Sequence, residues 1–289
     1  MTIVQLLLGL LVVCGLILLA AWRVAATRQR QPGGLPSPLH ALVGLVVNFF
    51  DTLGIGSFAT TTSAFRLMGL VRDELIPGTL LVGLALPVIA QALIFITVVE
   101  VDPVQMAVLI GACVAGGWFG AGIVASISRR AIQIAMGIAL TAAAGLMLTG
   151  MLGLIPSGGT ATTFSTPAFL VALAVSLVFG ALLTIGIGNY APSLIVFSLL
   201  GMDPRAAFPI MMGSGAFVAT VAGSRFIARA RFDGRAALGL TIGGVPGVLI
   251  AAWFVQSLPL DVLRWVVLVV VLYSAASLLR AARQDDAQA

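Results

Sequence analysis

The chain has 289 residues, of which 60% are hydrophobic and only 9% are charged. So little polar surface cannot cover a water-soluble globule, so the main solvent of the folded chain must be lipid. All fifteen basic residues are arginine, which excludes mechanisms that need a lysine, such as a phosphate-loop ATPase. The net charge of +5 does not indicate nucleic-acid binding, because the arginines lie in short loops between apolar runs.

Apolar runs of helical length predict an all-α polytopic membrane protein rather than a β-barrel, whose strands would be shorter and alternating. The predicted full spans are seven: 2–22, 76–99, 104–127, 131–152, 207–224, 236–257 and 262–280. The first span lacks a basic leading region and a small-residue cleavage site, so we expect a retained helix rather than a signal peptide.

Two further apolar segments, 41–70 and 173–202, are interrupted at their middles by glycine pairs. Gly54 and Gly56 lie 132 residues before Gly186 and Gly188, and the register continues without a gap. Other pairs at this offset include Leu45 with Leu177, Gly69 with Gly201, Pro77 with Pro209 and Gly111 with Gly243. The sequence therefore predicts an internal duplication, with a first repeat at 39–153 and a second at 169–283.

The arginines predict how the two repeats lie in the membrane, since basic loops stay on the cytoplasmic side. The basic loops contain Arg23, Arg28 and Arg30; Arg129 and Arg130; and Arg225, Arg229, Arg231 and Arg235. Full crossing by 41–70 would put its two basic flanks on opposite sides of the membrane, and full crossing by 173–202 would put the four-arginine loop outside. A re-entrant or broken helix in each segment avoids both conflicts. Each repeat then has three full spans, an odd number, so the repeats are predicted to be inverted. Continuous helices kinked by glycine are the alternative.

The same topology places the chain ends. Residues 1–30 form an N-terminal transmembrane helix and a cytoplasmic loop, with the N-terminus outside. Residues 284–289 form a cytoplasmic tail.

Both interruptions lead into hydroxyl or amide side chains, which favours anion binding at the start of the following helix. The predicted substrate-binding residues are Gly56, Ser57, Thr60, Thr61, Gly188, Asn189, Tyr190 and Ser193. Such neutral donors suit a small oxyanion that takes several hydrogen bonds without a fixed countercharge. The alternative is that these small residues only allow close helix packing.

Three residues are candidates for coupling or gating. Asp51 is an acidic residue well inside an apolar segment, where a charge costs roughly 2.5–3.5 kcal/mol on insertion scales. Proton or cation coupling would explain it, with Asn48 as a neighbour one turn earlier, and a structural aspartate would explain it equally. Arg66 either lines the cytoplasmic mouth or is a topology marker whose charge reaches the membrane surface.

Enzyme chemistry is not predicted. The chain has one histidine and no paired-histidine or Gly-x-Ser-x-Gly motif, and Cys14 and Cys113 lie in separate apolar runs. We expect no catalytic residue, no metal site and no cofactor.

The stretch Leu53–Gly56, paired with Ile185–Gly188 in duplicated halves, resembles the TauE/SafE sulfite-exporter family of bacterial transporters. Supporting stretches are Val47–Thr52, Asn189–Pro192 and Ala207–Gly213, and the resemblance covers roughly 39–283. The family pattern has a third glycine and then a proline after each break, where this chain has Ser57 and Thr60 in one half and Asn189 in the other. The resemblance implies transport of small sulfur-containing or organic anions.

The functional hypothesis is a gradient-coupled secondary transporter in the bacterial inner membrane. It would move sulfite, an organosulfonate, a related sulfur oxyanion or a carboxylate, with its site between the two broken helices. A membrane sensor or scaffold and an uncoupled anion channel are the alternatives. The expected partners are the anion and the lipid bilayer, with no nucleic acid, and a homo-oligomer is left open.

Overall fold

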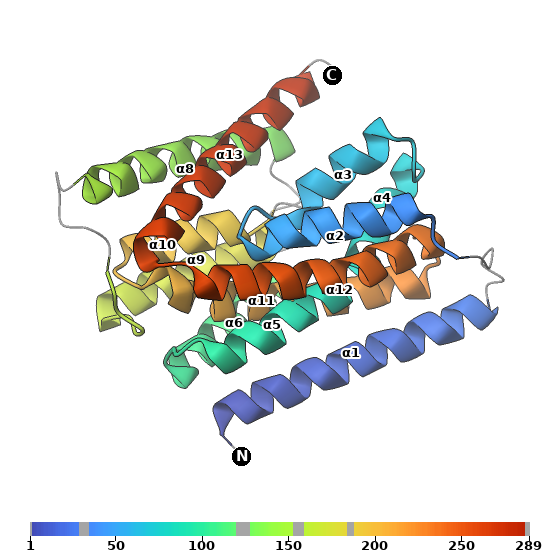
Figure 1. Ribbon diagram of the computed structural model, residues 1–289, viewed down its shortest axis with the longest axis horizontal. Coiled ribbons are helices and arrows are strands. Elements are labelled where there is room, and N and C mark those ends of the chain that lie inside the picture. The colour runs from blue at the N-terminus through green and yellow to red at the C-terminus, as the bar shows by residue number, and fades with distance from the viewer. Residues whose placement is uncertain (1, 29–34, 120–127, 153–158, 184–187, 287–289) are drawn as a thin grey trace. The chain divides into compact units, whose positions relative to one another are not determined.

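The computed structural model describes residues 2–28, 35–119, 128–152, 159–183 and 188–286 (Figure 1). Within these ranges the chain is helical without a β-strand, as the composition predicted; one isolated bridge pairs Ala161 with Met202. The elements are α1 (Ile3–Arg28), α2 (Pro38–Thr52), α3 (Ser57–Leu67), the 3-10 turn η1 (Asp73–Leu75), α4 (Ile76–Gly83), α5 (Ala85–Val98), α6 (Pro103–Phe119), α8 (Arg129–Met151), α9 (Thr166–Leu183), α10 (Tyr190–Leu199), α11 (Pro204–Ala228), α12 (Gly234–Ser257) and α13 (Leu260–Asp286).

Seven stretches of the described chain are helical, long and apolar enough to cross a membrane, which confirms the polytopic class. They are Ile3–Ala25, Ile76–Val98, Arg130–Met151, Thr166–Leu183, Pro204–Ala228, Gly234–Val255 and Asp261–Arg283. This set of seven spans differs from the predicted set in two places. The predicted span 104–127 is described only to Phe119, because 120–127 lie outside the described residues. Helix α9 begins at Thr166, seven residues before the predicted 173, and so reaches spanning length.

The span Ile76–Val98 consists of two helices, because Leu84 separates α4 from α5. Pro87 explains the interruption, since proline has no N–H and its ring clashes with the carbonyl four residues earlier. That carbonyl belongs to Gly83, and the Thr241 hydroxyl donates a 2.8 Å hydrogen bond to it from α12. The interruption therefore costs the helix a backbone bond that a neighbouring side chain replaces.

Helix boundaries repeat at the offset found in the sequence. Shifted by 132 residues, α3 falls on 189–199 and α10 runs over Tyr190–Leu199. The same shift places α8 on 261–283, within α13, and the start of α6 one residue after the start of α12. The helix boundaries thus follow the duplication that the sequence predicts. The inverted orientation of the two halves stays a prediction.

The chain divides into two compact units that do not coincide with the two repeats. Unit 1 comprises Met1–Thr52, Gly56–Val98 and Met212–Gln256; unit 2 comprises Leu53–Ile55, Val99–Met211 and Ser257–Ala289. Each unit therefore combines elements of both repeats: α2 to α5 with α12 in unit 1, and α6 and α8 with α9, α10 and α13 in unit 2. Each is described by itself.

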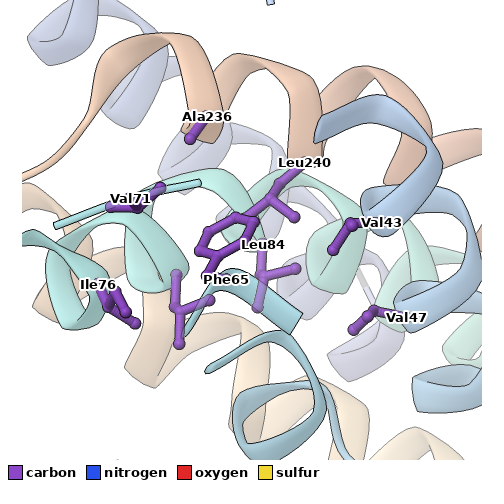
Figure 2. Close-up of a cluster of buried hydrophobic side chains, with 9 residues drawn as sticks. Val43, Val47, Phe65, Val71, Ile76, Leu84, Ala236 and Leu240 are labelled. Atoms are coloured by element: carbon purple, nitrogen blue, oxygen red, sulfur yellow. The ribbon is translucent and has the colours of Figure 1, made fainter. Parts of the chain in front are cut away.

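Unit 1 has a core between α2, α3, α4 and α12, with the fully buried Phe65 ring at its centre (Figure 2). Around it lie Val43, Val47, Val71, Ile76, Leu80, Leu84, Ala236 and Leu240. Helices α2 and α12 approach closely, because a Cβ atom at Gly243 would overlap the Ala41 carbonyl and one at Gly247 would overlap that of Leu45. Van der Waals packing through small residues is the main source of helix association in lipid.

Unit 2 also packs its helices through glycines. Helices α6 and α9 pack together, with Gly116 against the Leu177 backbone and Gly180 against the backbone of the buried Cys113. Helices α8 and α13 form a second close pair (Figure 1). Gly111, the repeat equivalent of Gly243, does not pack in this way, because a Cβ there would meet no atom within 4 Å.

Candidate functional site

The first break is present as predicted. Helix α2 ends at Thr52 and α3 begins at Ser57. Between them Gly56 is the N-cap of α3, with φ 86° and ψ 134°, a backbone conformation that residues other than glycine rarely adopt. The glycine thus lets the chain stop one helix and start another within four residues.

Asp51 lies at this break with 2% of its surface exposed. Gln91 of α5 donates from Nε2 to Asp51 Oδ2 at 2.9 Å and to the Thr52 hydroxyl oxygen, also at 2.9 Å. Ser57 donates to the same carboxyl group from both its hydroxyl and its backbone N–H. Because Ser57 is the first residue of α3, Asp51 accepts from one of the N–H groups that a helix start leaves without an intrahelical partner. The aspartate therefore acts as an anion bound at the start of α3.

Asn48 lies one turn before Asp51 on α2 and is fully buried. Its Nδ2 donates to the Gly44 carbonyl at 2.8 Å, and its Oδ1 has no hydrogen-bond partner among the described residues. A Cβ at Gly244 of α12 would lie 2.6 Å from the Asn48 amide nitrogen, so the absence of a side chain there makes room for the amide. A buried acceptor without a donor costs free energy and calls for an explanation.

The predicted hydroxyl donors of the first half are used by their own helix. Thr61 donates to the Ser57 carbonyl at 2.7 Å, and Thr60 donates to the carbonyls of Gly56 and Ser57 at 3.2 and 3.0 Å. Thr52 likewise donates to the Asn48 carbonyl at 2.7 Å. A hydroxyl must rotate away from its carbonyl before it can donate to a ligand.

The second break lies between Leu183, the end of α9, and Tyr190, the start of α10. Gly186 and the rest of 184–187 lie outside the described residues. Asn189 is the N-cap of α10 and is 2% exposed, yet its side chain makes no capping bond and its Oδ1 has no partner among the described residues. The Ser193 N–H donates to the Asn189 carbonyl at 2.9 Å as the first turn closes.

Open space adjoins both helix starts. A Cβ at Gly56 or at Gly188 would meet no atom within 4 Å, whereas one at Gly54 would lie 3.2 Å from Leu194. Tyr190 and Ser193, in the first turn of α10, are buried, with 6% and 3% of their surface exposed. The predicted site residues of unit 2 therefore cluster around one helix start, and those of unit 1 around another.

Arg66 does not belong to either cluster. It is exposed in the last turn of α3, nine residues from the break, where a cation interacts favourably with the helix C-terminus. Gln91, by contrast, contacts Asp51 directly and was not among the predicted residues. A single glutamine inside an otherwise apolar span was the signal that could have found it.

Metal chemistry gains no support from the described residues, where no group of three or more histidine, cysteine, aspartate or glutamate side chains lies close together. What the two helix starts offer is N–H, amide and hydroxyl donors in buried surroundings. Comparison with known proteins gives a family match for part of the chain. Residues 168–289 match the model of the sulfite exporter TauE/SafE family. The match contains the second break and all of the α10 cluster, and it confirms the resemblance found in the sequence for the second repeat.

TauE/SafE is a transporter family and not an enzyme family, so the match confirms the prediction that the chain is not an enzyme. With the apolar helices, the match supports a multi-pass membrane protein of the transport class. No curated protein and no solved structure matches the chain.

Proposed function

We propose that the protein is a secondary transporter that moves a small sulfur oxyanion, organosulfonate or carboxylate across the bacterial inner membrane, driven by an ion gradient. The proposed orientation has the N-terminus outside and the C-terminus in the cytoplasm, following the basic loops. The observation that carries the proposal is the buried amide of Asn189 at the start of α10, which makes no capping bond and whose Oδ1 has no partner among the described residues.

The start of α10 has the chemistry of an anion site. The first N–H groups of a helix have no intrahelical acceptor, and the helix dipole favours a negative charge there. Pro192 has no N–H to leave unpaired in this turn, so the donors come from the residues before it. Amide nitrogen and oxygen are assigned from hydrogen bonding, and a rotated Asn189 amide would offer two further donors to an oxyanion. A Cβ at Gly188 would meet no atom within 4 Å, so the glycine leaves space beside the helix start.

The start of α3 is the repeat equivalent of this site. Ser57, Thr60 and Thr61 supply hydroxyl groups that can rotate toward a ligand, and Gly56 adjoins open space. Asp51 and Asn48 lie beside them and are proposed to couple transport to the gradient. Arg66, on the exposed end of α3, is proposed to attract anions at the mouth rather than to bind them at the break.

Equilibrium exchange in proteoliposomes tests the α10 site. Vesicles with reconstituted protein are loaded with unlabelled sulfite, thiosulfate, sulfoacetate or acetate, and entry of the same labelled anion is followed. We expect saturable exchange of at least one sulfur oxyanion, and at least a tenfold loss in Asn189→Ala because its donors are removed.

The matched control is Gln133→Ala on α8, which also removes a buried amide with an unpartnered oxygen but lies on a helix that flanks neither break. Unchanged exchange in Asn189→Ala, or an equal loss in Gln133→Ala, would contradict the assignment of the site. Flux that never saturates would instead favour the channel alternative.

A further inference from the structure

The carboxylate of Asp51 occupies the helix start where an anion would bind in the first half. Its contacts are donors: the Gln91 amide and the hydroxyl and backbone N–H of Ser57. Ser57 is one of the residues proposed to bind the transported anion. The same N–H and O–H groups cannot serve the Asp51 carboxylate and a substrate oxyanion together, and two negative charges sharing one set of donors repel each other.

We propose that the transported anion displaces Asp51 from the donors of Ser57 and that Asp51 takes up one proton when it does so. The proton comes from the aqueous side that supplies the anion and returns to water on the side where the anion leaves, so proton and anion move in the same direction. This inference rests on the proposed function, names its coupling ion and adds Gln91 to the coupling residues.

Asn48 provides the acceptor that a protonated Asp51 needs. A neutral carboxylic acid has an O–H to donate, and residues three apart on a helix are side-chain neighbours. The Oδ1 of Asn48, buried and without a donor, lies one turn before Asp51 on α2. Protonation of Asp51 thus frees the donors of Ser57 and satisfies the unpaired oxygen of Asn48 in the same step. The arrangement explains a buried polar atom that otherwise has no role.

A metal cation fits these contacts less well than a proton. A sodium ion needs several oxygen atoms turned toward it, whereas Gln91 presents its N–H groups to both Asp51 and Thr52. Rotating that amide to offer its oxygen would remove two hydrogen bonds. A proton on Asp51 needs no such change.

In the part of the chain that the structure describes, no arginine lies beside Asp51 to hold it ionised. On its own helix the titratable neighbour is His40, eleven residues and ~16 Å along α2. On α3 it is Arg66 at the opposite end of the helix, on α12 it is Arg235 in the first turn, and α5 has no charged residue. The charge of Asp51 is therefore balanced by hydrogen bonds alone, which allows a proton or an anion to change it.

The test uses reconstituted full-length protein and labelled thiosulfate, which stays fully ionised near neutral pH and so carries no proton of its own. Asp51→Asn imitates the protonated carboxyl group because it is neutral and can donate to Asn48. We expect this variant to keep thiosulfate exchange at equilibrium, to lose accumulation driven by a pH gradient, and to carry no proton with the anion. The control, Asp261→Asn, removes an exposed carboxylate and should accumulate thiosulfate normally.

Accumulation by Asp51→Asn equal to that of the wild type would overturn the inference, as would wild-type uptake of thiosulfate without proton movement. Loss of both exchange and accumulation in folded Asp51→Asn would also overturn it. A wild type that exchanges no anion at all would instead refute the proposed function, and the coupling with it.

If Asp51→Asn does not fold, the wild type alone decides. Thiosulfate binding in detergent should weaken as the pH rises, by up to about tenfold per pH unit, because binding takes up one proton. An affinity that does not change with pH would refute the coupling.

Discussion

Replacement of Gly56 by alanine tests whether the first break depends on a backbone conformation that only glycine adopts. At φ 86° and ψ 134° an L-residue is strained, whereas a methyl group there would meet no atom within 4 Å. The change therefore adds strain without a steric clash. Such conformations cost about 1–3 kcal/mol, and the reduced entropy of the unfolded chain offsets about 0.4–1 kcal/mol of it. We expect Gly56→Ala to lower the free energy of unfolding by about 1–2 kcal/mol.

Gly188→Ala is the matched control for this change. Gly188 is the repeat equivalent of Gly56 and also adjoins open space, but its φ lies outside the left-handed region. We expect unfolding in mixed detergent micelles to show wild-type stability for Gly188→Ala and a folded-to-unfolded ratio about 5–30-fold lower for Gly56→Ala. Equal stability of the two variants would refute the account of the break. Exchange should fall in both, because each methyl group enters the space beside a helix start.

Three further changes separate stability from function. Asn189→Ala should alter the free energy of unfolding by less than about 0.5 kcal/mol, because no capping bond is lost. A loss near the usual ~1 kcal/mol in thermal denaturation would mean that the amide does cap α10. Gln91→Leu should lower the free energy of unfolding by about 1–3 kcal/mol, because it leaves a buried carboxylate with one hydrogen-bond donor fewer. The loss should be smaller in a protein that already carries Asp51→Asn, and additive losses in this double-mutant cycle would contradict the contact. Gly243→Ala should lower the free energy of unfolding by about 1–3 kcal/mol by forcing α2 away from α12, whereas Gly111→Ala at the equivalent position should leave it unchanged or raise it slightly. Similar losses for the two variants in chemical denaturation would show that the two sites pack alike.

The membrane fold could be predicted because its signals are local. Runs of about 20 apolar residues leave little choice but a helix, since each backbone group must find its partner within the segment. The first break was predictable for a similar reason, because the glycines at 54 and 56 interrupt an apolar run and admit a left-handed conformation. The start of α9 at Thr166 was missed, since the uncharged stretch before it has neither the charges nor the apolar run that would mark a boundary.

Contacts between distant segments could not be predicted in the same way. Gln91 lies forty residues from Asp51, and nothing in an isolated glutamine says which residue it will contact. Gly111 and Gly243 occupy equivalent positions in the two repeats, yet only one of them faces a neighbouring backbone. The repeat predicts which helices form but not how the compact units divide them, since that depends on packing between the halves.

The predicted site residues fall between these cases. Residue type and position at a helix start were sufficient to select Ser57 and Asn189, because the orphan N–H groups of a helix start follow from helix geometry. Residue type and position did not predict which hydrogen bonds each side chain makes. Only the fold reveals that Thr61 donates to its own helix and that Asp51 already accepts from Ser57.

The proposed transporter moves a small anion against its concentration gradient by using an ion gradient. Accumulation of labelled thiosulfate or sulfite in wild-type proteoliposomes under an imposed pH gradient is the decisive measurement. We expect an internal concentration above the external one, saturation with rising substrate, and collapse of the gradient when a protonophore is added. Entry that stops at equal concentrations and does not saturate, or no entry by well-folded protein, would contradict it.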